Sequence, residues 1–165
     1  MSVSRDIAQS WFRPWRVMRR LMSQGQREDR ALAFLMIACT LIFVSYWPQM
    51  QAEAARDPSV PLDARLGGGM LAWLAVMPLV AYGIAAASHI LARILGGKGS
   101  FYTARLALFW ALLAASPAWL VQSALTVAAP GPASRGAAAL TLALTLFIWL
   151  SNLITAEWGK RHATV

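Results

Sequence analysis

Four stretches of this chain are apolar over the length of a membrane-spanning helix, and this feature limits the possible folds more than any other. Residues 31–48, 106–129 and 137–156 contain no Asp, Glu, Lys or Arg, and another stretch is uncharged from Met70 to Ala87. A helix needs about 20 apolar residues to cross about 30 Å of hydrocarbon. The sequence therefore predicts an all-α integral membrane protein with four transmembrane helices, at about residues 31–48, 68–92, 106–129 and 137–156.

The overall composition agrees with a membrane protein. The chain of 165 residues is 58% hydrophobic and only 13% charged, whereas a soluble domain has roughly 25% charged residues. The formal net charge of +8 does not predict nucleic-acid binding, because the basic residues lie beside the apolar stretches, where they fix orientation and contact anionic lipid headgroups. Cys39 is the only cysteine, so no disulfide can form within the chain and no cysteine-based metal cluster is expected.

The distribution of basic residues predicts that both termini are cytoplasmic. Lys and Arg are retained in the cytoplasm beside spanning helices, and twelve lie in alternate segments on one side against three on the other. An even number of spans independently requires both ends on the same side. We expect cytoplasmic tails at residues 1–30 and 159–165 and a membrane domain at residues 31–158. The twelve are Arg5, Arg13, Arg16, Arg19, Arg20, Arg27, Arg30, Arg93, Lys98, Arg105, Lys160 and Arg161, and the three are Arg56, Arg65 and Arg135.

The N-terminal tail has the pattern of an amphipathic helix. Large apolar residues recur every three or four positions, and arginines occupy the other faces, as in helices that lie in the membrane interface. We expect this interfacial helix to begin near Arg13, with Pro14 in its first turn, and to end at Gly25. Lipid is the favoured partner of its apolar face, and a partner protein is the alternative. The residues expected to contact the membrane surface or a partner are Trp11, Trp15, Met18, Arg16, Arg19 and Arg20.

Two prolines and a few small or polar residues are expected to shape the membrane domain. Pro78 and Pro117 lie inside the second and third spans, where a proline kinks a helix; the alternative is a hinge or a broken transporter helix. Gly83 and Ala87 are one turn apart, which favours close helix packing. Asn152 is expected to pair with a neighbouring helix.

No set of catalytic or metal-binding residues is apparent in the sequence. All seven acidic residues are expected outside the hydrocarbon, with no two at a common site, and His89 is expected to be interfacial and hydrogen-bonded locally near Ser88 and Arg93. We therefore expect a protein that is not an enzyme and that has no catalytic, cofactor-binding or metal-binding residues.

Residues 88–120 resemble the core of the Yip1-domain family. In that family a helix ends in a cytoplasmic loop of the form Gly-Gly-x-Gly-Ser/Thr-Phe/Tyr, and the next helix carries a proline in mid-span, as Pro117 does here. The N-terminal RPWRVMRRL and REDRALAFLM are similar to a small alphaproteobacterial branch, which implies the bacterial inner membrane. Family members commonly have five spans, whereas four are predicted here. The matching loop residues are Gly96, Gly97, Lys98, Gly99, Ser100, Phe101 and Tyr102.

Two interpretations of this loop and two functions remain open. The glycines suit a tight turn with positive backbone angles, with Phe101 and Tyr102 re-entering at headgroup level; the alternative is a binding loop. For the whole chain we expect a scaffold, adaptor or accessory subunit of a larger membrane complex, in contact with the lipid bilayer and other membrane proteins but not nucleic acid. The alternative is a channel or facilitator for a small solute, lined by Ser116, Gln122, Ser123 and Asn152.

Overall fold

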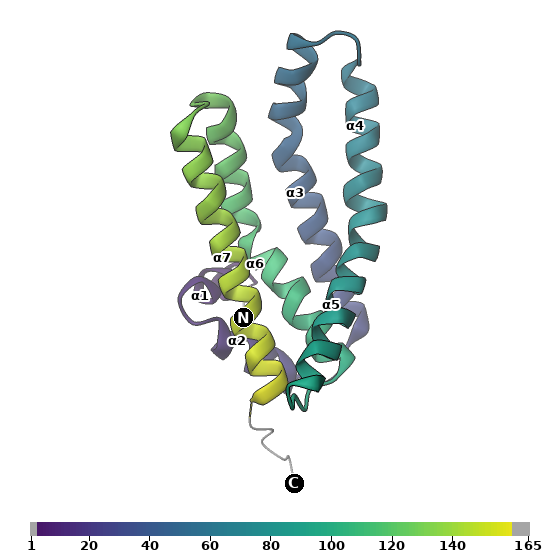
Figure 1. The fold of residues 1–165 in the computed structure, drawn as a ribbon, viewed down its shortest axis with the longest axis vertical. Coiled ribbons are helices and arrows are strands. Elements are labelled where there is room, and N and C mark those ends of the chain that lie inside the picture. Colours follow the sequence, from purple (N-terminus) through teal and green to yellow (C-terminus); the bar gives the residue numbers. More distant parts are fainter. Residues whose placement is uncertain (1–2, 160–165) are drawn as a thin grey trace.

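The computed structural model describes residues 3–159, and every regular element in that range is a helix. Residues 160–165 of the expected C-terminal tail lie outside the described residues. They include Lys160 and Arg161, which entered the charge count. In chain order the elements are α1 (Val3–Phe12), α2 (Pro14–Ser23), α3 (Glu28–Arg56), α4 (Leu62–Leu71), the π-helical turn η1 (Ala72–Val76), α5 (Met77–Ile94), α6 (Phe101–Ala128) and α7 (Pro132–Trp158) (Figure 1).

Four helical segments are long and apolar enough to cross a membrane, as predicted. They are α3, the continuous run α4–η1–α5, α6 and α7, and each is longer than expected. The clearest difference is in the first span, expected to end at Pro48, because α3 continues to Arg56. A proline removes only one backbone donor. Just before it, Tyr46 stacks on Trp73 of η1 with ring centroids 5.7 Å apart, which holds α3 beside η1 at the point where the helix was expected to end.

Helix α6 is the central element of the bundle and packs against α3, α5 and α7. Figure 1 shows α3 beside α4 and α6 beside α7, with the ends of α5 and α7 and the start of α6 at the same end of the molecule. The exposed face of α5 is broad: among its residues only Ala81, Ala85, His89 and Ala92 are buried. Because three of these are alanines on one face of the helix, α5 can approach α6 closely.

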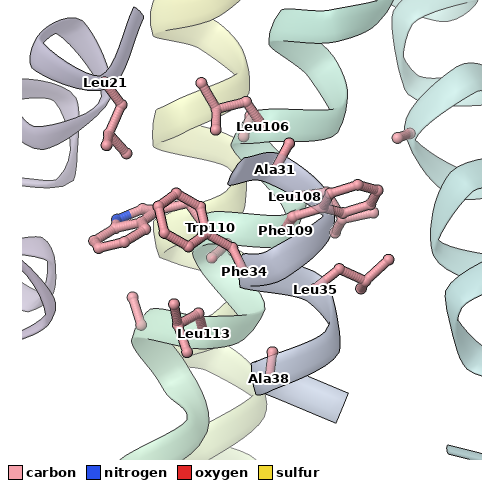
Figure 2. Close-up of a cluster of buried hydrophobic side chains, with 14 of the residues drawn as sticks. Leu21, Ala31, Phe34, Leu35, Ala38, Leu106, Leu108, Phe109, Trp110 and Leu113 are labelled. Carbon is pink, nitrogen blue, oxygen red and sulfur yellow. The ribbon is translucent and has the colours of Figure 1, made fainter. Parts of the chain in front are cut away.

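Aromatic side chains form the centre of the core between α3, α5 and α6 (Figure 2). Phe34 meets Trp110 edge to face with ring centroids 5.0 Å apart, and Tyr82 meets Phe109 in the same way at 5.0 Å. In a membrane the surrounding lipid is as apolar as these rings, so packing rather than removal from water stabilises the pairs. Each such pair contributes about 0.5–1.5 kcal/mol.

The helices continue through both predicted kink sites, Pro78 and Pro117, and the local structure at each proline explains how. Pro78 is the second residue after η1, and a π-helical turn gives the proline ring room against the preceding turn. Pro117 lies inside α6, which bends along its length (Figure 1). A proline at 117 leaves the Leu113 carbonyl without its helical donor, and the Ser116 hydroxyl donates to that carbonyl at 2.8 Å.

The N-terminal tail forms two helices that pack against α6 and α7. Helix α2 begins at Pro14, as expected, and Arg13 separates it from an additional helix, α1, that precedes it. Gly25, with φ +83°, follows the end of α2, as predicted for a helix stop. Val17 and Met18 are fully buried in the core, which makes the tail part of the bundle.

Candidate functional site

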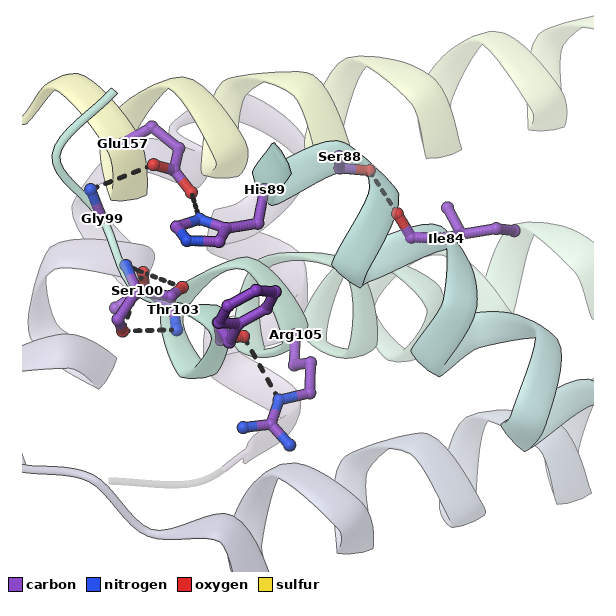
Figure 3. A network of polar contacts seen from close by, with 9 residues as sticks. Ile84, Ser88, His89, Gly99, Ser100, Thr103, Arg105 and Glu157 are labelled. Carbon is purple, nitrogen blue, oxygen red and sulfur yellow. Dashed lines mark hydrogen bonds and ion pairs between the residues drawn. The ribbon is translucent and has the colours of Figure 1, made fainter. Parts of the chain in front are cut away.

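A buried polar pair joins α5 to α7 at the end of the bundle (Figure 3). The His89 Nδ1 lies 2.7 Å from the Glu157 Oε1, and the two side chains are 3% and 0% exposed. The expectation for His89 was therefore wrong: its partner is 68 residues away in the sequence instead of local. The pair contains one acidic residue, Glu157, so it does not bear on the expectation that no two acidic residues share a site. The sequence did hold one signal for this pair. Glu157 lies at the end of the fourth apolar stretch, and His89 lies near the end of the second, which is expected on the same side of the membrane.

The glycine loop, residues 96–100, closes over the carboxylate of Glu157. The Gly99 N–H donates to the Glu157 Oε2 at 3.0 Å, and the Lys98 N–H donates to the Glu157 main-chain carbonyl at 2.8 Å. A Cβ at Gly97 would lie 2.8 Å from the Glu157 Oε2, and one at Gly99 would lie 2.6 Å from the same oxygen. Two of the glycines are thus required because the backbone approaches a side chain closely.

Fewer of the loop glycines than expected are needed for their backbone angles. Only Gly96 of the loop glycines has a positive φ, at +82°, and its role is to end α5. The expectation of positive angles at Gly97 and Gly99 was wrong, because those glycines make room for Glu157. The loop is therefore a chain reversal and also a lid over a buried carboxylate.

The first turn of α6 fixes the loop from the other side. The Ser100 side chain accepts from the Thr103 N–H, and the Thr103 side chain accepts from the Ser100 N–H, so the two residues cap the helix reciprocally. Phe101 is half exposed and its ring centroid lies 4.4 Å from that of His89. Tyr102, expected beside it at headgroup level, is instead buried, and its hydroxyl donates to the Gly25 carbonyl at 3.4 Å.

A pocket opens beside the His89 ring. Its walls are formed by α5 and the first residue of α6, and its lining combines one cationic, one imidazole and three apolar side chains. The lining residues are His89, Ile90, Arg93, Ile94 and Phe101. Glu157 contacts the Nδ1 of His89, and no hydrogen bond within residues 3–159 engages the Nε2 of the ring.

The N-terminal residues expected at the membrane surface are divided between two environments. Trp11 packs against the core and its Nε1 donates to the Ala114 carbonyl at 2.7 Å, while Met18 is fully buried. Trp15, Arg16 and Arg19 are exposed. Arg20 is partly exposed and lies 2.5 Å from Asp6. Half of the expected surface is thus available to lipid or a partner.

The small and polar residues of the spans also lie in different environments, some exposed and some buried. Gly83 and Ala87 lie on the exposed face of α5, and a Cβ at Gly83 would meet nothing within 4 Å. Asn152 is fully buried and was expected to pair with another helix, but neither atom of its amide has a hydrogen-bond partner within residues 3–159. The expected interhelix pairing of Asn152 was therefore wrong.

The residues of the alternative channel serve other contacts. The Ser116 hydroxyl bonds within α6, and the Gln122 amide donates to Thr126 of the same helix at 3.0 Å. The Ser123 hydroxyl accepts from the Gln49 amide at 3.0 Å and donates to the Ser45 carbonyl, which ties α6 to α3. Of these three side chains, Ser123 joins two helices, and Ser116 and Gln122 bond within α6.

The chemistry that this site offers is hydrogen bonding and proton sharing. His89 and Glu157 can hold one proton between them, and Arg93 adds a fixed positive charge at the pocket. Within residues 3–159 no three His, Cys, Asp or Glu side chains are grouped so as to hold a metal ion. Scans against family models, curated proteins and solved structures give no match to this chain.

Proposed function

We propose that this chain is a non-enzymatic, Yip1-like protein of the bacterial inner membrane that acts as a scaffold or accessory subunit of a larger membrane complex. In this proposal both termini are cytoplasmic, and the exposed face of α2 lies against anionic headgroups. The resemblance of the glycine loop and the twelve-to-three distribution of basic residues support this placement.

The observation that carries the proposal is the exposed face of α5. Its opposite face uses Ala81 and Ala85 to pack on α6, while Gly83 and Ala87 form a second small-residue face that no part of the described chain covers. Small residues one turn apart let a second helix approach closely enough for van der Waals packing, which drives helix association in lipid. A partner helix on this face would make α4–α5 the docking arm of the protein.

The test is purification of a tagged full-length chain from native membranes in a mild detergent. We expect the wild type to bring a membrane partner with it and Gly83→Leu to lose that partner, because the added side chain fills the approach surface. Gly136→Leu is the matched control, since Gly136 is also an exposed helical glycine with nothing within 4 Å of a Cβ. Recovery of the wild type as a free monomer would contradict the proposed function.

A further inference from the structure

The pocket beside His89 contains a polar atom that the fold itself leaves unused. His89 is only 2% exposed, yet it lines the pocket. Glu157 holds its Nδ1, and Phe101 lies against its ring at 4.4 Å between centroids. No hydrogen bond within residues 3–159 engages its Nε2. In a neutral ring with the proton on Nδ1 the Nε2 accepts a hydrogen bond, and in the doubly protonated ring it donates one.

The charge at the mouth of the pocket is positive. Arg93 lies in the last turn of α5 and is exposed, and it has no ion pair with any residue in the described part of the chain. Arg105, one turn along α6 from Phe101, is engaged differently: its guanidinium lies 2.6 Å from Glu28. Phe101 is also the first residue of the 28-residue helix α6, whose positive dipole end therefore lies beside the pocket. An anion is the ligand that this arrangement favours.

The surroundings of the pocket identify the source of that anion as lipid. Three exposed apolar side chains line it: Ile90, Ile94 and Phe101 are 53%, 76% and 53% exposed. Apolar side chains exposed to this degree at the end of an apolar helix contact acyl chains when the helix spans a membrane. A soluble phosphate would make no favourable contact with these apolar side chains. A phospholipid can place its headgroup in the cationic pocket and its acyl chains against the apolar side chains.

We propose that His89 and Arg93 form a binding site for the headgroup of an anionic phospholipid. The guanidinium of Arg93 binds the phosphate, and the Nε2 of His89 bonds a headgroup hydroxyl or a phosphate oxygen. Glu157 and the glycine loop hold the imidazole in place. This site lies toward the C-terminal end of α5 from Gly83 and Ala87, and its Ile90 and Ile94 continue their face of the helix. Its test needs no partner protein, so the lipid site and the proposed docking face can fail separately.

Native mass spectrometry of the full-length chain in detergent tests this site, with phosphatidylglycerol and phosphatidylcholine as lipid probes. We expect the wild type to retain one phosphatidylglycerol at least about tenfold more strongly than phosphatidylcholine, the effect of a charge-assisted hydrogen bond. Arg93→Gln should remove this preference without affecting the fold, because Arg93 is exposed. Arg135→Gln is the matched control, since Arg135 is an exposed arginine near the start of α7, and it should leave the preference unchanged.

Inorganic phosphate and glycerol 3-phosphate, added in separate arms, distinguish the source of the phosphate. Neither should displace the lipid at equal concentration. Displacement would mean that the ligand is a water-soluble phosphate and would overturn the lipid assignment. Equal retention of both lipids by the wild type, or an unchanged preference in both Arg93→Gln and His89→Gln, would overturn the site itself. His89→Gln is interpreted only if its thermal unfolding midpoint shows that it is folded.

Discussion

Substituting Gly99 by alanine tests whether the glycine loop exists to enclose Glu157. The new Cβ would lie 2.6 Å from both the Cδ and the Oε2 of Glu157, a distance at which one of the groups must move. The φ of Gly99 is not in the left-handed region, so backbone strain does not contribute. Gly99→Ala should therefore push the carboxylate away from the Gly99 N–H.

The expected cost follows from the hydrogen bonds of the carboxylate. Glu157 accepts one from the Gly99 N–H at 3.0 Å and is bonded to His89 at 2.7 Å, and the clash removes at least the first. A hydrogen bond to a charged group contributes about 1.5–3 kcal/mol. For a chain of this size about 1 kcal/mol corresponds to about 2–4 °C. Gly99→Ala should lower the midpoint of thermal unfolding by roughly 3–12 °C.

The only cysteine of the chain provides the assay. Cys39 is 2% exposed in the core, so a maleimide dye that fluoresces on reaction with thiols reports its exposure as the detergent-solubilised protein unfolds. The matched control is Gly83→Ala, where a Cβ meets nothing and where alanine in place of a helical glycine is expected to be neutral or stabilising by up to about 1 kcal/mol. No substitution in this comparison alters the reporting thiol.

A double-mutant cycle with Glu157→Ala separates the clash from any other effect. Once the carboxylate is gone, Gly99→Ala should cost nothing and could even stabilise by about 0.4–1 kcal/mol through the unfolded chain. If Gly99→Ala is neutral in the wild type, or lowers the midpoint equally in both backgrounds, the loop does not serve to enclose Glu157 and the reasoning is refuted.

Three further predictions concern other parts of the chain. Trp11→Phe removes the indole N–H bonded to a main-chain carbonyl of α6 and should cost about 1 kcal/mol in the same thermal assay, while Trp15→Phe, at an exposed side chain, should cost nothing measurable. Asn152→Leu replaces a buried amide without partners and should raise the midpoint, since an unsatisfied polar group costs about 1–3 kcal/mol; a lower midpoint would mean that the amide is bonded. Hydrogen bonds from the Ser59 hydroxyl and then its backbone N–H lower the pKa of Asp57 from its ordinary 3.8, so the stability from this turn is present above that value and is lost as the pH falls through the lowered pKa. Carboxyl NMR should show that pKa rising toward 3.8 in Ser59→Ala, and an unchanged titration would exclude the hydroxyl as the cause.

The number and position of the apolar helices could be predicted from the sequence because hydropathy acts locally. An uncharged run such as residues 106–129 is a property of consecutive residues, and α6 covers it almost completely. Helix ends were predicted less well. Pro48 suggested a terminus, yet α3 continues past it. Next to Pro48, Tyr46 stacks on Trp73 of η1. This contact joins distant parts of the chain, so the local sequence around Pro48 could not predict it.

The candidate site could not be predicted because its parts meet only in the folded bundle. His89 and Glu157 are each unremarkable at the end of a helix, and only the antiparallel arrangement of α5 and α7 relative to α6 brings them together. Similarly, the spacing of Trp11 and Met18 indicates that they share an apolar face. Spacing cannot say whether lipid or protein covers that face, and here α6 and α7 cover part of it.

The bond from Trp11 to Ala114 also sets an order of events during biosynthesis. The indole is synthesised 103 residues before its acceptor, and at about 5–20 residues per second the ribosome needs roughly 5–20 s to bridge that interval. Helix α1 therefore leaves the ribosome long before α6 exists to receive it. The contact between α1 and the bent α6 can therefore form only after residue 114 has been synthesised.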